Sequence, residues 1–277
     1  IGAVTATAGT LGVTATTGSI NDAADDSTAD FTAGGLITLT AQDEIGVLGS
    51  GTDTDLEFAA SSSVNVSTTG TGAIDLDGLG ALTLSDVDTA NGAITVTSAG
   101  ALTVTDVATG NNNAIALTTS SGDITGLATV NAGSGAVTLN SAGAIVDDSD
   151  ASTVVTGGVL TADAAGAITI DSTVTSADIS TSAAGAIALD ETDGITLTDL
   201  DTTDGSITVS AGGALTATDV VAGGGTGDSV TLSTTTGGAV ATLVTGADAV
   251  SITADAGDIT IGAVTATAGT LGVTATT

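Results

Sequence analysis

The chain of 277 residues contains no Lys, Arg, His, Cys, Met, Trp, Tyr or Pro. Without basic residues, it cannot bind nucleic acid or anionic lipid by neutralising phosphate groups. Without Cys and His, it has no disulfide, no thiol chemistry, no ligand for soft metals and no imidazole acid or base. No apolar run approaches the roughly 18 residues of a membrane span, so we expect no membrane insertion.

Acidic residues are abundant by contrast: 32 Asp and Glu give a formal net charge of -32. Paired carboxylates can act as a catalytic acid and base, as in some β-helix enzymes that degrade pectin. Those enzymes also use His and basic residues, and a surface of this charge would repel their polyanionic substrate. We therefore predict that the protein is not an enzyme. The hydrophobic fraction of 42% and the regular spacing of Ile, Val and Leu indicate a folded chain rather than a disordered one.

Residues 1–17 and residues 261–277 have the same sequence, IGAVTATAGTLGVTATT. An identity of this length indicates a tandem repeat with a period of 260 residues. We therefore divide the chain into one full repeat unit, residues 1–260, and the start of an identical second unit, residues 261–277. The natural protein is then expected to be a long array of such units. Because Ile1 is not preceded by a signal peptide, any export signal is expected to lie outside the chain or to have been removed.

A shorter period runs through the unit. A short alternating strand is followed by two or three small residues, a Gly and a second alternating strand, as in AITVTSAGALTV at 93–104. First strands start near positions 10, 36, 64, 93, 114, 136, 159, 178, 206, 229 and 249, which gives eleven repeats of about 24 residues. A Gly at a fixed place indicates a bend that requires positive φ or a close backbone approach.

This pattern predicts the fold. Alternation of Ile, Val or Leu with Thr, Ser or Asp is typical of strands with one buried and one wet face. A unit of this size cannot bury its apolar face alone, whereas stacked units can. We therefore predict an all-β protein, a parallel β-solenoid of about eleven rungs per 260-residue repeat. Two β-sandwich repeats are the main alternative, but sandwiches need hairpin turns and usually larger core side chains.

The repeats resemble a known family. Runs such as GSITVSAGGALTATDV at 205–220, and GDITIGAVTATAGTLGVTATTGSI from Gly257 through the repeat boundary to Ile20, are similar to filamentous-haemagglutinin-type repeats. That family comprises large exported bacterial adhesins with right-handed β-helical stalks. The resemblance implies a right-handed solenoid at the cell surface or outside the cell, in a filament or an adhesin stalk.

Asp side chains form the candidate binding sites. Several Asp-x-Asp pairs occur, and residues i and i+2 of a strand share a face. Counting five residues beyond three successive bend glycines leads to Asp148, Asp171 and Asp190, which should stack on consecutive rungs about 4.8 Å apart. No cation of the chain offsets their repulsion, so either their pKa values rise or a cation is bound. We expect Ca²⁺, which prefers carboxylate oxygens; the alternative is solvated side chains with diffuse counterions.

Two further features concern the role of the surface. Thr-x-Thr elements such as Thr95/Thr97 and Thr103/Thr105 would bind ice if they recurred in register, but they skip rungs. Phe31 and Phe58, the only aromatic residues, lie in an atypical acidic stretch where they either cover the core or mediate lateral contacts between fibres.

We expect a structural, non-catalytic segment of a giant extracellular filament or adhesin stalk whose partners are copies of itself and divalent cations. The alternative is a binding module for a glycan, a surface or ice.

Overall fold

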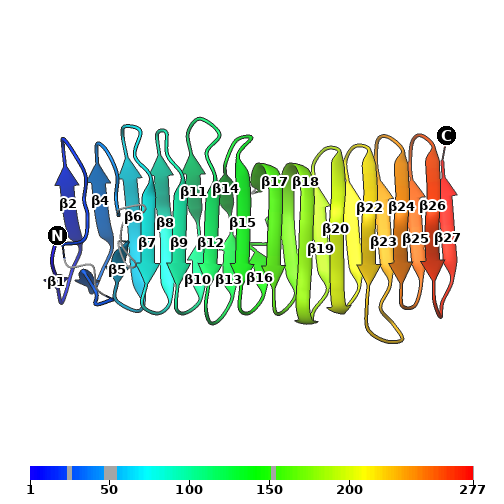
Figure 1. Ribbon diagram of the computed structural model, residues 1–277, viewed down its shortest axis with the longest axis horizontal. Coiled ribbons are helices and arrows are strands. Elements are labelled where there is room, and N and C mark those ends of the chain that lie inside the picture. Colours follow the sequence, from blue (N-terminus) through cyan, green and yellow to red (C-terminus); the bar gives the residue numbers. More distant parts are fainter. Residues whose placement is uncertain (24–26, 47–54, 151–153, 277) are drawn as a thin grey trace. The chain divides into compact units, whose positions relative to one another are not determined.

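The computed structural model describes residues 1–23, 27–46, 55–150 and 154–276. These residues form strands joined by turns and contain no helix, hence none long and apolar enough to cross a membrane. The chain divides into two compact units, Ile1–Ala142 (unit 1) and Gly143–Thr277 (unit 2). Figure 1 shows their strands.

The strands of unit 1 are β1 (Val4–Ala6), β2 (Leu11–Ala15), β3 (Phe31–Ala33), β4 (Ile37–Ala41), β5 (Leu56–Phe58), β6 (Ser62–Thr68), β7 (Ile74–Gly78), β8 (Leu82–Thr89), β9 (Ile94–Ser98), β10 (Leu102–Val104), β11 (Asp106–Thr109), β12 (Ile115–Thr119), β13 (Ile124–Leu127), β14 (Thr129–Asn131) and β15 (Ala136–Ser141). Those of unit 2 are β16 (Ile145–Asp147), β17 (Val155–Ala164), β18 (Ile168–Ala184), β19 (Ile187–Glu191), β20 (Ile195–Asp204), β21 (Ile207–Ala211), β22 (Leu215–Ala222), β23 (Val230–Thr234), β24 (Ala239–Gly246), β25 (Val250–Ala254), β26 (Ile259–Ala266) and β27 (Leu271–Ala275).

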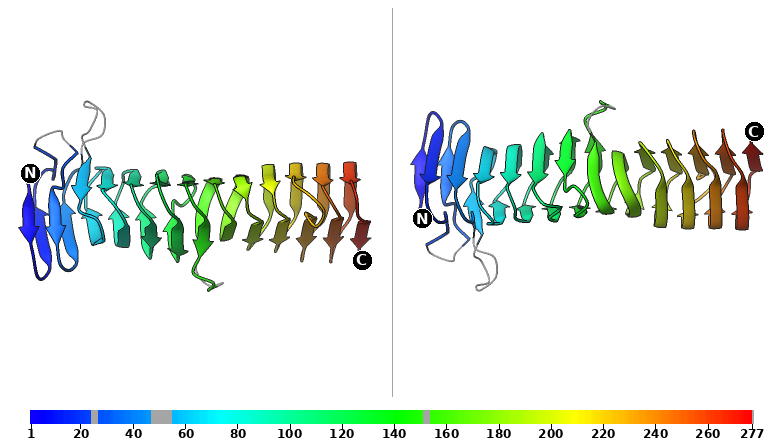
Figure 2. Two further views of the ribbon diagram at one scale, coloured as in Figure 1. Left: turned by 90° about the horizontal axis from the view of Figure 1, so that it is seen from below. Right: turned by 90° about the horizontal axis from the view of Figure 1, so that it is seen from above.

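Each unit is a parallel β-solenoid. In unit 1 one column of paired residues is Leu11, Ile37, Val64, Leu84 and Val104. In unit 2 one such column of paired residues is Ile145, Ile168, Ile187, Ile207, Val230, Val250 and Leu271. Within each unit, successive turns lie side by side in both further views (Figure 2). The predicted all-β parallel β-solenoid is confirmed.

The core of each unit lies inside the turns. In β20 the inward residues are Ile195 and Leu197, then Leu200 and Thr202. Pairing with β22 is interrupted between Leu197 and Leu200, where two consecutive residues point outward. Such a change of phase marks a corner, because a straight strand alternates strictly between its two faces. Short strands and bent long strands therefore enclose the apolar side chains.

Inward hydroxyl groups form hydrogen bonds at many of the turns that follow a strand. Thr202, which is buried, donates a hydrogen bond of 2.5 Å to the carbonyl of Gly205. The same bond to a Gly carbonyl three or four residues later recurs at Thr68, Thr89, Thr119, Thr181 and Thr234. A buried hydroxyl without a partner costs free energy, so this hydrogen bond satisfies the inward Thr where the chain turns.

Gly at a corner allows the turns to stack closely. A Cβ added to Gly205 would lie 2.2 Å from the carbonyl oxygen of Gly185 on the preceding turn, which is shorter than any real contact. One added to Gly185 would lie 2.5 Å from the amide nitrogen of Ala167. Close approach of the backbone is thus the reason for Gly at these two bends.

The register differs from the predicted spacing at two places. Val64 pairs with Leu84 rather than with the strand near 93, because Ile94 is in register with Ile74. The strand predicted to start near 178 is part of β18, a single strand that runs through a corner and pairs with β20. Alternation alone does not distinguish a corner within a strand from a turn between strands. The rungs predicted from the sequence are therefore displaced at these two places.

Candidate functional site

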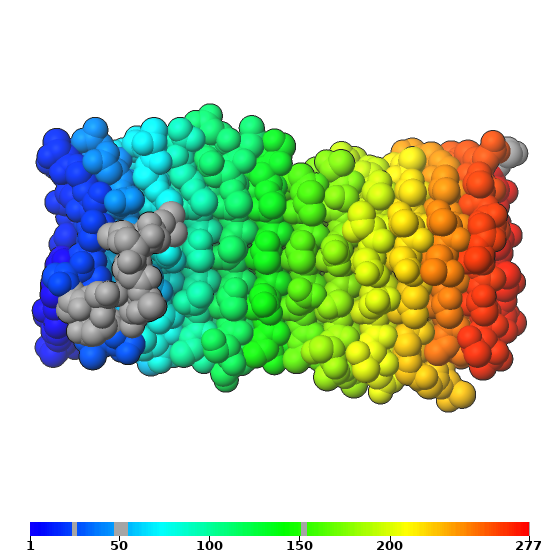
Figure 3. All heavy atoms as spheres, viewed as in Figure 1, coloured from blue at the N-terminus to red at the C-terminus, as the bar shows by residue number. Residues whose placement is uncertain are grey.

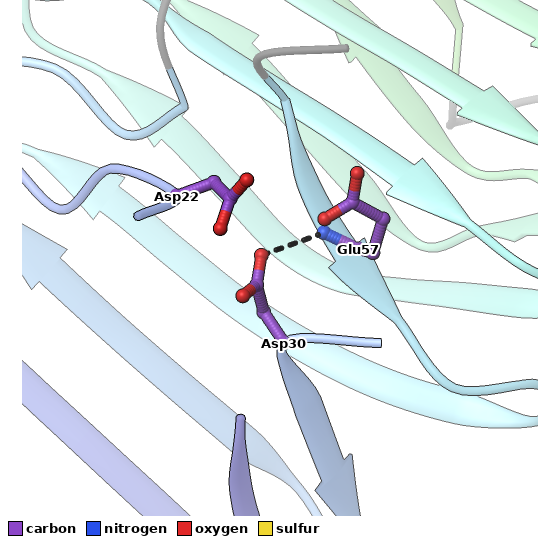
Figure 4. Close-up of side chains that lie close together, drawn as sticks. All are labelled: Asp22, Asp30 and Glu57. Atoms are coloured by element: carbon purple, nitrogen blue, oxygen red, sulfur yellow. Dashed lines mark hydrogen bonds between the residues drawn. The ribbon is translucent and has the colours of Figure 1, made fainter. Parts of the chain in front are cut away.

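Three carboxyl groups of unit 1 come together inside the molecule. Asp22 follows the first turn, Asp30 precedes β3, and Glu57 lies within β5 (Figure 4). One carboxylate oxygen from each lies within 4.8 Å of the others. Glu57 is fully buried and Asp30 is 5% exposed. Among the described residues, this is the only group of three acidic side chains gathered so closely, and hard cations such as Ca²⁺ bind carboxylate oxygens in this way.

The position of two of these acids follows from the only aromatic residues. Phe31 pairs with Phe58 on the next turn, and their rings stack with centroids 5.5 Å apart. Both rings are fully buried, so they belong to the core rather than to a lateral contact between fibres. Each Phe follows an acid directly, and the amide of Glu57 donates a hydrogen bond of 3.4 Å to Asp30 Oδ2. The repeated acid–Phe dipeptide was the signal that sequence reasoning missed.

Burial raises the pKa of Asp30 above its ordinary value. Its hydrogen bond with Glu57 lowers the pKa, and the nearby carboxylate of Asp22 raises it. A cation among the three groups would favour their charged forms, since an opposite charge at close range lowers a carboxyl pKa. The cluster can therefore hold either protons or a cation.

The predicted column of three Asp residues lies in unit 2. Asp171 on β18 is in register with Asp190 on β19, as the count from the bend glycines predicts. Asp148 directly follows β16, which pairs with β18 through Val146 and Thr169. Burial raises the pKa of Asp171, and the neighbouring Asp147, Asp190 and Asp148 raise it further. Binding of Ca²⁺ by these residues stays a prediction.

Asp171 and Asp190 border a hollow of about 180 Å³ on the surface of unit 2. The other residues around it are Thr169, Ala188, Leu189, Thr208 and Ser210. Asp190 is in register with Ser210 on the next turn, so a hydroxyl continues the carboxylate column. Oxygen ligands on successive turns suit a hydrated divalent cation.

A second acidic column occurs in unit 2. Asp178 pairs with Asp199, and Asp219 precedes Val220, which pairs with Leu200. Asp201 lies beside them, and its pKa is raised by burial and then by Asp199, Asp219 and Asp178. Sequence reasoning singled out only the Asp199/Asp201 pair, because it compared neighbours along one strand rather than across turns.

Two other Asp-x-Asp pairs each contain one carboxyl group with a raised pKa. Asp75 and Asp77 occupy alternate outward positions on β7; burial raises the pKa of Asp75 to about 6, helped by Asp55 and Asp77. On β8, burial together with Asp86 and Asp106 raises the pKa of Asp88 to about 6. The remaining pairs are Asp148/Asp150, in the turn after β16, and Asp53/Asp55, of which Asp53 lies outside the described residues.

In unit 2, the side chain of Glu191 faces the core. Glu191 ends β19, is 1% exposed, and is in register with Ser172 and Ala211 on the adjacent turns. It accepts hydrogen bonds from the Ser172 hydroxyl at 2.6 Å and from the Val174 amide at 3.1 Å. Burial nevertheless raises the pKa of Glu191 to about 7, because these bonds offset only part of the lost hydration.

Thr-x-Thr elements stack across turns only in part. Thr103 pairs with Thr83 on one side and with Thr125 on the other, whereas the rows of Thr95 and Thr97 are mixed. Thr95 and Thr97 pair with Asp75 and Asp77 on one side. On the other side they pair with Ala116 and Thr118. Figure 3 shows one face of the molecule, on which successive turns follow one another within each unit. The register of unit 1 gives the row Asp77, Thr97, Thr118 and Asn140, which mixes residue types.

Comparisons with models of protein families, with curated protein sequences and with solved structures find no match for this chain.

Proposed function

We propose that the chain is a structural, non-catalytic segment of a long tandem-repeat filament or adhesin stalk of the filamentous-haemagglutinin type, placed outside the cell. Its partners are further copies of the same repeat, and its role is to span distance rather than to carry out chemistry. Divalent cations bound by stacked carboxylates are expected to moderate its charge.

The observation that carries this proposal is the repeated end sequence in its structural setting. Residues 1–17 form the turn that contains β1 and β2. The second copy of this sequence, residues 261–277, begins within β26 and contains β27. Leu11 pairs with the following turn through Ile37, and its equivalent Leu271 pairs with the preceding turn through Val250. One copy can therefore accept a turn on each side, which is what a continuous array requires.

The composition supports an extracellular stalk over a binding module. Base-stacking or sugar-stacking surfaces need exposed aromatic rings, and both rings of this chain are buried. Ice-binding surfaces need regular Thr columns, and the rows around Thr95 and Thr97 are interrupted by Asp and Ala. A chain without Lys and Arg offers trypsin no cleavage site, which suits a filament exposed to proteases.

The test is to locate the repeat on cells that produce the protein. An antibody against the 277-residue chain should label intact cells, and trypsin treatment should leave the repeat uncut. Cryo-electron microscopy of released filaments should show an axial spacing of about 4.8 Å, the distance between stacked strands. Labelling only after permeabilisation would contradict the extracellular role, and filaments without this spacing would contradict the structural role.

A further inference from the structure

One row of outward side chains in unit 2 is interrupted by a small residue. Thr169 on β18 pairs with Ala188 on β19, and Ala188 pairs with Thr208 on β21. The methyl group of Ala188 is shorter than the Thr side chains on both sides of it, so the surface is lower there. This step is the floor of the hollow of about 180 Å³ that Asp171 and Asp190 border, which we name the Ala188 hollow.

Carboxylate groups lie along one side of this floor. Asp171, Asp190 and Ser210 form the next outward row, two residues further along the same three strands. Residues i and i+2 of a strand share a face, so the hollow has a methyl floor, hydroxyl groups at its ends and carboxylates along one side. Asp190 is exposed and Asp171 is half-buried, so a ligand can reach both of them.

The charge around the hollow is of one sign. The chain contains no Lys, Arg or His that could neutralise it. Burial raises the pKa of Asp171, and the carboxylates of Asp147, Asp190 and Asp148 raise it further. An opposite charge at close range would lower this pKa again. The Ala188 hollow is therefore complementary in charge to a cationic ligand.

The size and lining of the hollow favour an alkylammonium group over a bare metal ion. A hollow needs about 10–15 Å³ to hold one water, whereas this one offers about 180 Å³. An ammonium group has three N–H donors, for which Asp171, Asp190 and Ser210 provide acceptors. The methylene stem of a Lys side chain covers apolar surface while its charge stays in water, and Ala188 provides such a surface. A guanidinium group is planar and prefers bidentate pairing with one carboxylate.

We propose that the Ala188 hollow is a docking site for a Lys side chain of a different protein. The ammonium group lies between Asp171 and Asp190, and the stem rests on Ala188. The occupant is not a second copy of this chain, because the chain contains no Lys. The inference goes beyond the proposed function, since it concerns a partner other than further repeats. Ca²⁺ is expected to compete with the Lys side chain for the same carboxylates.

The test separates the hollow from the charge around it. Nα-acetyl-lysine amide is titrated into the chain with chelator at constant high NaCl, and NMR follows the amide signals of Ala188 and Asp190. Ala188→Thr fills the hollow with the side chain that both neighbours in its row already carry, and it leaves every carboxylate in place. This variant and Asp190→Asn should each weaken binding about fivefold, which is the upper range for an exposed ion pair.

Two matched controls alter the surface outside the hollow. Ser251→Thr enlarges an exposed side chain on β25, and Asp255→Asn removes an exposed carboxylate after β25. Both controls should bind the amine as the unmodified chain does. Circular dichroism should show the same β spectrum for all four variants.

Three outcomes would overturn the proposal. Unchanged affinity in Ala188→Thr would show that the amine responds only to diffuse charge. Binding of Nα,Nε-diacetyl-lysine amide, which keeps the stem without the charge, would exclude the role of the carboxylates. Ethylammonium lacks most of the stem and should bind more weakly, and equal binding would assign the hollow to small amines rather than to a protein side chain. None of these failures affects the proposed structural role, which is tested by cell labelling and axial spacing.

Discussion

At the scale of single residues, the absence of any basic side chain decides how buried acids behave. Glu191 lies inside unit 2 with hydroxyl and amide donors but with no cationic side chain of the chain to pair with. Its pKa of about 7 means that the folded state holds a proton which the unfolded state, near the ordinary value of 4.5, has already lost. Between these two values, stability falls as pH rises.

We predict that Glu191→Gln raises the melting temperature at pH 8 and changes it little at pH 4. The amide keeps the shape of the side chain and removes the charge, and the window between the two pKa values corresponds to about 3 kcal/mol at most. Thermal denaturation of both proteins across pH 4 to pH 8 measures the effect. Parallel pH profiles for the two proteins would show that Glu191 does not titrate in this window.

At the scale of strands and corners, close stacking of turns depends on the corner glycines. We predict that Gly205→Ala lowers the free energy of unfolding by about 2 kcal/mol or more, because the new Cβ would overlap a backbone carbonyl that cannot move alone. Chemical denaturation measures the loss. Gly225→Ala is the matched control, since a Cβ there meets no atom within 4 Å, and equal stabilities of the two variants would contradict the packing argument.

The Asp column gives a prediction at the same scale. Millimolar Ca²⁺ at constant high NaCl should raise the melting temperature relative to chelator, because bound cations stabilise the folded state by mass action. Asp171→Asn should abolish the shift, whereas Asp255→Asn, at an exposed position after β25, should preserve it. A shift that survives Asp171→Asn but not Asp30→Asn would place the cation at the Asp22–Asp30–Glu57 cluster instead.

At the scale of the whole molecule, the carboxyl groups whose pKa is shifted all shift in the same direction. The pKa is raised at Asp30, Asp75, Asp88, Asp106, Asp171, Glu191 and Asp201, with burial as the first cause in every case. Each of these groups contributes a stability that is present below its unfolded-state pKa and is lost as pH rises through the folded-state value.

We therefore predict that the protein is more stable near pH 4 than near pH 8. The melting temperature should fall over this range, by less at high ionic strength, because salt screens repulsion among exposed carboxylates. Calorimetry at low and high NaCl tests both statements. A protein that becomes more stable as pH rises would contradict the inferred pKa shifts.

Much of the fold follows from the sequence because a solenoid is built from local patterns. Alternation sets which side chains face inward, and Gly at the bends sets where turns approach one another. Counting from those glycines was enough to bring Asp171 and Asp190 into register, because in both turns a single residue follows the Gly and an uninterrupted strand then leads to the Asp.

Only the tertiary structure decided which strands share a column where turn lengths differ. Val64 pairs with Leu84, and Phe31 pairs with Phe58 across a long acidic stretch; that second pairing brings Asp30 beside Glu57. Such contacts depend on the number of residues that form the corners of each turn. The alternation of polar and apolar residues does not indicate that number. The sequence alone therefore determined a parallel β-solenoid with stacked acids, while the packing of unequal turns determined which acids meet inside it.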